Sequence, residues 1–121
     1  MKYAGKERRK GQRFQAKLIV SYRICDEDNN IDVSQSKNVG LGGMLLTTNK
    51  AFRPGTNLAL TIRMPFASDP VNIIARVEDS KEVQKDEIFD TRLSFVSIDE
   101  KHKKFLLEAL DYYKKKEGKN S

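Results

Sequence analysis

Two short clusters of residues, about two dozen positions apart, hold the side chains of this chain that are best suited to binding a ligand. The first is an amino-terminal group of arginines, in which Arg9 and Arg13 have the spacing R-x-x-x-R and Arg8 directly precedes them. A guanidinium group presents five donors in a rigid planar fork, so it can grip a phosphate with two hydrogen bonds or stack on a base. Gly11 lies between the arginines and eases a bend that brings them onto one ligand. The cluster therefore indicates recognition of a group that is both anionic and planar.

The second cluster is the segment 38–43, with the sequence Asn-Val-Gly-Leu-Gly-Gly. Asn38 offers a donor and an acceptor that suit a base edge. Glycine weakens strand interiors, so Gly40, Gly42 and Gly43 are expected where φ is positive or where another group approaches the backbone closely. Their spacing is not that of a dinucleotide-binding fingerprint, and no helical pattern follows. The two clusters together predict a site for a small, planar, anionic ligand, and a guanine nucleotide fits best.

The rest of the pattern predicts the elements that position these clusters. Apolar residues recur at every second position over 14–24, with Ile19 as the one apolar residue on the other face, which predicts a long half-buried antiparallel strand. Five further strand-like runs follow at about 31–38, 44–48, 58–64, 71–77 and 88–98. The period then changes to that of an amphipathic helix over 99–117. We expect one mainly β domain, with a flexible basic arm (1–13), a six-stranded antiparallel β-barrel (14–98) and a C-terminal helix (99–117).

Composition and charge narrow the class of protein further. No run of about 18 apolar residues exists, and the amino-terminal residues lack the apolar stretch of a secretory signal. The single cysteine, Cys25, cannot form an internal disulfide or a zinc cluster. We therefore expect a cytoplasmic protein without a membrane span. The net charge is +6, and it is concentrated at the two ends of the chain, while the middle is mildly acidic.

The two clusters, in this order on an all-β pattern with a terminal helix, resemble the motifs of the PilZ domain family. Arg9 and Arg13 match the family's R-x-x-x-R motif, and Asn38 and Gly43 match the ends of its (D/N)-x-S-x-x-G motif. The resemblance implies a bacterial receptor for the second messenger cyclic di-GMP, with a PilZ-type barrel, no cofactor and a protein partner in a signalling or motility pathway. It implies that binding orders the arm and changes the partner contacts. The implied ligand-binding residues are Arg8, Arg9, Arg13, Asn38, Gly40, Gly42 and Gly43.

In the family, an arginine directly before the R-x-x-x-R motif accompanies binding of an intercalated ligand dimer. Arg8 therefore implies two cyclic di-GMP molecules per protein. One departure from the pattern is that Gly40 stands at the motif's serine position. A competing register at Asp32-Val33-Ser34 keeps the serine but places Lys37 where glycine is required, so Asn38 is the better match. The missing hydroxyl removes one hydrogen bond, worth about 0.5–1.5 kcal/mol.

Two other functions remain open at this point. The chain could be a degenerate PilZ-like domain that acts only by protein contact, or a small β-barrel that binds nucleic acid. The second is disfavoured because the phenylalanines fall mostly on inward faces and offer no stacking platform. An enzyme is not expected: His102 is the only histidine, and Cys25 lies beside acids that disfavour a thiolate. No catalytic or metal-binding residues are predicted.

Overall fold

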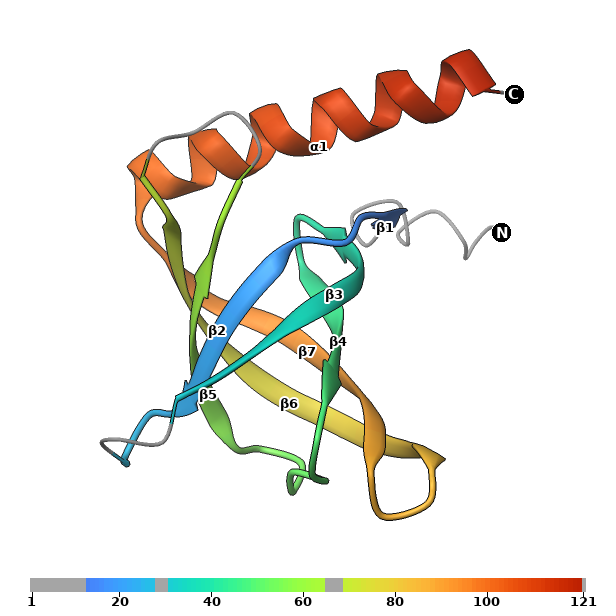
Figure 1. Ribbon diagram of the computed structural model, residues 1–121. Helices are drawn as coiled ribbons and strands as arrows, with labels where there is room; N and C mark the ends of the chain where they lie inside the picture. Colours follow the sequence, from blue (N-terminus) through green and yellow to red (C-terminus); the bar gives the residue numbers. More distant parts are fainter. Residues whose placement is uncertain (1–12, 28–30, 65–68, 121) are drawn as a thin grey trace, which may run out of the picture.

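The computed structural model describes residues 13–27, 31–64 and 69–120, which form seven strands and one helix (Figure 1). Their bounds are β1 Arg13–Gln15, β2 Ile19–Ile24, β3 Asp32–Gly40, β4 Gly43–Thr48, β5 Asn57–Ile62, β6 Val71–Gln84, β7 Ile88–Ile98 and α1 Glu100–Asn120. The strands are antiparallel in the order β1-β3-β2-β5-β6-β7-β4, and β4 also pairs with β3, which closes the sheet. This confirms the expected six-stranded antiparallel barrel with a C-terminal helix. Residues 1–12 of the expected arm, with Arg8 and Arg9, lie outside the described residues, while Arg13 begins β1.

The core follows from the period-two patterns of the strands. In β5, the side chains of Leu58, Leu60 and Ile62 are at most 1% exposed, while Ala59 and Thr61 between them are only half-buried. The same alternation places Val71, Ile73, Ala75 and Val77 of β6 inside. Burying a Leu, Ile or Val side chain contributes about 1.5–3 kcal/mol, so register is strongly specified wherever these rows face inward.

The expected strand 14–24 is interrupted, and this is the main difference from the sequence pattern. β1 and β2 both pair with β3, with Gln15 opposite Asn38 and Ile19 opposite Gln35. Three residues, 16–18, thus face two residues of β3 across the break. One extra residue on one strand is a β-bulge, which bends the strand and raises its local twist. The six strand positions of the barrel therefore contain seven strand segments.

Two other boundaries also differ from the expected ones. The strand expected at 71–77 is longer in the structure, since β6 continues to Gln84 and the turn occupies Lys85–Glu87. Asp86 in this turn has a φ of 56°, a left-handed conformation that aspartate tolerates better than most residues. The helix begins one residue later than expected and extends to Asn120.

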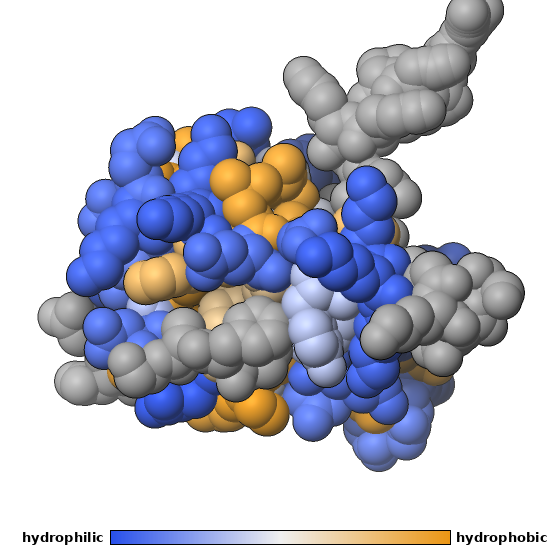
Figure 2. Space-filling view, turned by 90° about the horizontal axis from the view of Figure 1, so that it is seen from above, coloured by the Kyte–Doolittle hydropathy of each residue, from blue (hydrophilic) through white to orange (hydrophobic). Residues whose placement is uncertain are grey.

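Helix α1 lies across one end of the barrel (Figure 1). Leu106, Ala109 and Leu110 are its buried residues, and α1 contacts β1 and β6. In its first turn, His102 Nδ1 accepts a hydrogen bond from the backbone N–H of Asn72, at 3.1 Å. Seen from the side of α1, the surface is mostly hydrophilic, with hydrophobic atoms gathered in small patches (Figure 2). In the described part of the chain, no helix has the length and apolarity needed to cross a membrane.

Candidate functional site

Strand β1 joins the end of the arginine cluster to the Asn-Gly cluster. Arg13 is the Cα partner of Gly40, and Gln15 is the partner of Asn38. The backbone of the second motif arginine therefore runs alongside the segment that the sequence singled out. Arg8 and Arg9 come a few residues before β1 in the chain, outside the described residues.

Ser36 holds β1 in this position. Its Oγ donates to the carbonyl of Ala16 at 2.6 Å and accepts from the N–H of Leu18 at 3.0 Å. These are the backbone groups that the bulge between β1 and β2 would leave unpaired. Ser36 is 1% exposed, so bulk water does not reach these groups. The buried hydroxyl of Ser36 thus pairs the backbone groups left at the bulge, and it fixes the position of β1, which follows the arm in the chain.

The Asn-Gly cluster forms the end of β3 and the turn into β4. Gly43 pairs with Ser94 of β7, and the carbonyl of Gly42 accepts a hydrogen bond from the N–H of Phe95 at 2.8 Å. Of the two reasons expected for these glycines, a positive φ does not apply to Gly42, and a Cβ added there would meet nothing within 4 Å. Among the described glycines, the one with a positive φ is Gly55, at 92°. The fold itself therefore does not require glycine at position 42, which leaves an open approach to its backbone.

Beside this segment lies a hollow of about 470 Å³, which we call the lysine hollow. It is lined by Gln15, Ala16, Lys17 and Lys37. None of these side chains is acidic, and Asn38 lies beside the hollow as the ladder partner of Gln15. Sequence reasoning did not include the two lysines in the site. The signal was available for Lys17, which alternation placed on the outward face of its strand, and for Lys37, which directly precedes Asn38.

The ammonium group of Lys37 forms an ion pair with the carboxylate of Asp90, which lies on another strand. Lys37 Nζ lies 2.7 Å from Asp90 Oδ1, and the side chains are 47% and 19% exposed. Asp90 belongs to β7 and pairs with Thr47 of β4. Because β4 lies between β3 and β7, the Lys37 side chain crosses β4 to reach its partner. Lys17 forms no ion pair with the described residues.

A smaller hollow of about 280 Å³ lies between the same turn and the helix. Its walls are Leu41 and Gly42 of the turn, Ile98 at the end of β7, and Lys103 and Leu106 of α1. It is largely apolar, with one cation at its margin. The open backbone of Gly42 thus borders this second concave surface next to the Asn-Gly cluster.

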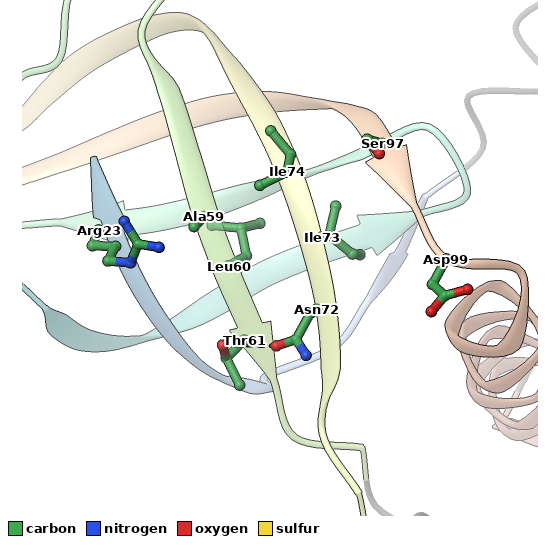
Figure 3. Close-up of a pocket in the computed structure, with 9 residues that line it drawn as sticks. All are labelled: Arg23, Ala59, Leu60, Thr61, Asn72, Ile73, Ile74, Ser97 and Asp99. Carbon is green, nitrogen blue, oxygen red and sulfur yellow. Dashed lines mark hydrogen bonds between the residues drawn. The ribbon is translucent and has the colours of Figure 1, made fainter. Parts of the chain in front are cut away.

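A third hollow, about 340 Å³, lies over β5 and β6 (Figure 3). Arg23 and Asp99 lie at opposite ends of it, and Thr61 and Asn72 lie close together along its side (Figure 3). Thr61 Oγ1 donates to Asn72 Oδ1 at 3.0 Å, and the Arg23 guanidinium donates to the carbonyl of Cys25 at 3.1 Å. Since the carboxylate of Asp99 lines it and its one arginine binds the chain's own backbone, this hollow is a weaker anion site than the lysine hollow.

Within the described ranges, no group of three or more His, Cys, Asp or Glu side chains is placed to hold a metal ion. Cys25, which directly follows β2, is half-buried and has a free thiol. The polar groups that gather at the candidate site are amide, ammonium and backbone groups. The ammonium groups favour an anionic ligand, while the amide and backbone groups can both donate and accept hydrogen bonds.

The model of the PilZ domain family matches residues 7–111. The chain belongs to the PilZ family. The match begins just before the arginine cluster and ends within α1, so it includes both motifs and the barrel. Among curated protein sequences, none matches the chain significantly.

Three solved structures share the PilZ fold of this chain. The inhibitor of motility MotI (DgrA) of Bacillus subtilis has a TM-score of 0.71 at 20% identity, over 90% of this chain and 50% of its own. The PilZ domain of YcgR from Escherichia coli, in a structure with c-di-GMP, has a TM-score of 0.62 at 16% identity, over 90% of this chain and 93% of its own. A tetrameric PilZ protein from Xanthomonas campestris has a TM-score of 0.56 at 14% identity, over 80% and 53%. This chain therefore spans only half the length of the Bacillus protein.

Proposed function

We propose that this PilZ domain is a receptor for cyclic di-GMP. The observation that carries the proposal is the β1–β3 ladder, in which Arg13 lies opposite Gly40 and Gln15 opposite Asn38. It places the start of the arginine arm beside the Asn-Gly segment, and both motifs are then within reach of one ligand. The YcgR domain, whose solved structure contains c-di-GMP, shares the fold over 90% of this chain, which supports the proposal.

Each part of the site has a defined task in this proposal. The guanidinium groups of Arg8, Arg9 and Arg13 bind the phosphates and stack on the guanines. Asn38 fixes the orientation of the ligand through its amide. The open backbone at Gly42 lets the nucleotide approach closely. Binding in this way orders the arm and presents a new surface to a protein partner, and two ligand molecules bind as an intercalated dimer.

Isothermal titration with cyclic di-GMP tests the proposal directly. Arg9→Ala and Arg13→Ala should each lose at least about tenfold in affinity, because charge-assisted hydrogen bonds to phosphate are the strong ones. Arg53→Ala makes the same change in net charge at an exposed arginine in the loop between β4 and β5, so its affinity should equal that of the wild type. Equal binding by all three variants would refute the assignment of the arginine motif.

The ordering of the arm has its own readout. Limited proteolysis should cleave the first dozen residues rapidly in the protein alone and slowly at saturating cyclic di-GMP. The number of ligand molecules per chain comes from the same titration, with two expected. A protein that binds without protection of these residues would show that the arm does not close over the ligand.

A further inference from the structure

The lysine hollow is lined by two cationic side chains, Lys17 and Lys37, which belong to neither sequence motif. Lys37 already forms an ion pair with Asp90. Lys17 and Lys37 line the hollow, and the backbone N–H of Ala16 donates to the carbonyl of Lys37 at 3.3 Å. The two strands are thus held together at the hollow, with one lysine contributed by each side. No carboxylate lines it, so its electrostatic character is cationic.

We propose that the lysine hollow is a phosphate subsite and that Asp90 competes with the ligand for Lys37. This inference rests on the proposed function, since it assigns one phosphate of the cyclic dinucleotide to Lys17 and Lys37. In the structure, the Lys37 ammonium lies against Asp90, across β4 from the hollow. Binding moves this ammonium from the carboxylate to the phosphate.

The exposure of Lys37 makes this exchange feasible. Its side chain is 47% exposed, so water and salt screen the pair from this side, whereas Asp90 is only 19% exposed. The lysine stem is long and flexible, so its ammonium can reach either partner from one Cα position. A phosphate carries its charge on several oxygens and can bind Lys17 at the same time.

Asp90 must be compared with the other acids near the site. Asp79 is occupied by Arg92, with the Arg92 Nη2 at 2.5 Å from Asp79 Oδ2, and Glu78 accepts from the hydroxyl of Ser94. Neither of them contacts a residue that lines the lysine hollow. Asp90 is thus the carboxylate in the described part of the chain that holds a cation away from this hollow. Its removal should therefore free a binding group rather than remove one.

The test is a titration of cyclic di-GMP into the full chain and a set of variants. Lys17→Ala and Lys37→Ala should each bind about three- to tenfold more weakly, while Lys85→Ala, an exposed lysine in the β6–β7 turn, should bind as the wild type does. Asp90→Asn should bind about two- to fivefold more tightly, because the competing ion pair is lost. Asp26→Asn makes the same change in net charge in the turn after β2 and should not change the affinity.

The double variant Lys37→Ala/Asp90→Asn separates competition from a general change in charge. If Asp90 acts through Lys37, the gain from Asp90→Asn disappears when Lys37 is absent. Urea unfolding of each variant confirms that the barrel is intact. A wild-type protein that binds while Asp90→Asn binds equally or more weakly would overturn this inference and leave the proposed function standing. Absence of binding by the wild type and every variant would overturn the proposed function, and the inference with it.

Discussion

Arg13 and Gly40 face each other as Cα partners in the antiparallel ladder between β1 and β3. These residues belong to the two motifs that the sequence separates by about two dozen positions, and the barrel makes them neighbours. The contact depends on β1, which is only three residues long and is separated from β2 by a bulge. The geometry of the proposed site therefore depends on what holds this short strand in place.

Ser36→Ala should release β1. The substitution leaves the N–H of Leu18 and the carbonyl of Ala16 without the hydroxyl that pairs them in a buried position. An unsatisfied buried group costs about 1–3 kcal/mol, so the free energy of unfolding should fall by that order. The affinity for cyclic di-GMP should fall as well, because the arm loses its anchor. Urea unfolding and calorimetry measure the two effects.

Ser34→Ala is the matched control for this prediction. Ser34 lies two residues earlier on β3, half-buried and opposite Val20. Its removal should change stability by less than about 0.5 kcal/mol and leave ligand binding intact. Equal losses in the two variants would contradict the role assigned to Ser36.

Gly42→Ala separates a requirement of the ligand from a requirement of the fold. A Cβ at Gly42 meets nothing within 4 Å, and φ there is not positive, so the variant should be at least as stable as the wild type. Its affinity for cyclic di-GMP should fall by about tenfold or more if the nucleotide approaches this backbone. Gly55→Ala should show the reverse pattern, with a loss of about 1–2 kcal/mol because φ is 92° and with unchanged binding. Unfolding and titration of both variants give the comparison, and a destabilised Gly42→Ala would contradict it.

Gly40→Ser restores the hydroxyl that the family motif has at this position. In the proposed receptor, it should raise the affinity for cyclic di-GMP by up to about tenfold, which corresponds to one hydrogen bond. The wild type should already bind measurably. A wild type without detectable binding, with strong binding by Gly40→Ser, would instead indicate a degenerate domain that has lost its ligand.

The barrel could be predicted from the sequence because its strands alternate cleanly. Phe14, Ala16, Leu18, Val20 and Tyr22 are all buried, as the period-two pattern requires. The same pattern concealed the bulge, since the inward-facing residues alternate through the break between β1 and β2, and the only departure is the exposed Ile19 on the outward face. Only the pairing with β3 reveals the extra residue. A local pattern predicts which face a residue occupies but not the register of its partner strand.

The sequence motifs indicated which residues lie together at the candidate site, but not all of the contacts that these residues make. The motif pair predicted Arg13, Asn38 and Gly40, which the structure brings together through the backbone. It did not predict the pairing of Lys37 with Asp90, because the two residues are far apart in the sequence and meet only when β4 aligns β3 with β7. Contacts of this kind depend on the closure of the barrel, so no local spacing signals them.

Tyr22 should make the stability of the protein depend on alkaline pH. Burial raises the pKa of its phenol above the ordinary value of 10.0, and the negative charge of Asp32 raises it further, while a hydrogen bond with the backbone of Asn49 lowers it. The unfolded chain therefore loses this proton at a lower pH than the folded protein does. The contribution of Tyr22 is fully present below about pH 10 and is lost as the pH rises through the folded-state pKa.

Urea unfolding at a series of pH values from 8 to 11 checks this prediction against Tyr22→Phe. The lysines titrate in the same range in both proteins, so the difference between the two curves isolates Tyr22. The variant should be less stable at neutral pH by about 0.5–1.5 kcal/mol for the lost hydrogen bond, and the gap should narrow above pH 10. Parallel curves over the whole range would contradict the prediction.

The hydroxyl groups of Thr48, Thr91 and Ser80 form a hydrogen-bonded chain that connects the loop after β4 to β7 and β6. Lys50 offers only a carbonyl, so Thr48 must donate to it at 2.9 Å and accept from Thr91 at 2.8 Å. Thr91 must in turn accept from Ser80 at 2.7 Å, and the Ser80 hydroxyl accepts from the N–H of Phe52 at 3.0 Å. Each hydroxyl donates once and accepts once, so the direction of the chain is determined by its two ends. Chains of this kind are cooperative, and their centre is the sensitive position.

Thr91→Val should therefore cost about 1–3 kcal/mol in the free energy of unfolding, because Thr91 is fully buried and both of its hydroxyl partners lose a bond. Thr61→Val is the matched control, since the Thr61 hydroxyl makes one exposed hydrogen bond, and it should cost less than about 0.5 kcal/mol. Cyclic di-GMP affinity should not change in either variant, because neither residue lines the lysine hollow or belongs to the Asn-Gly segment. A loss of affinity in Thr91→Val without a loss of stability would mean that the hydroxyl chain reaches the ligand site by a route other than the rigidity of the barrel.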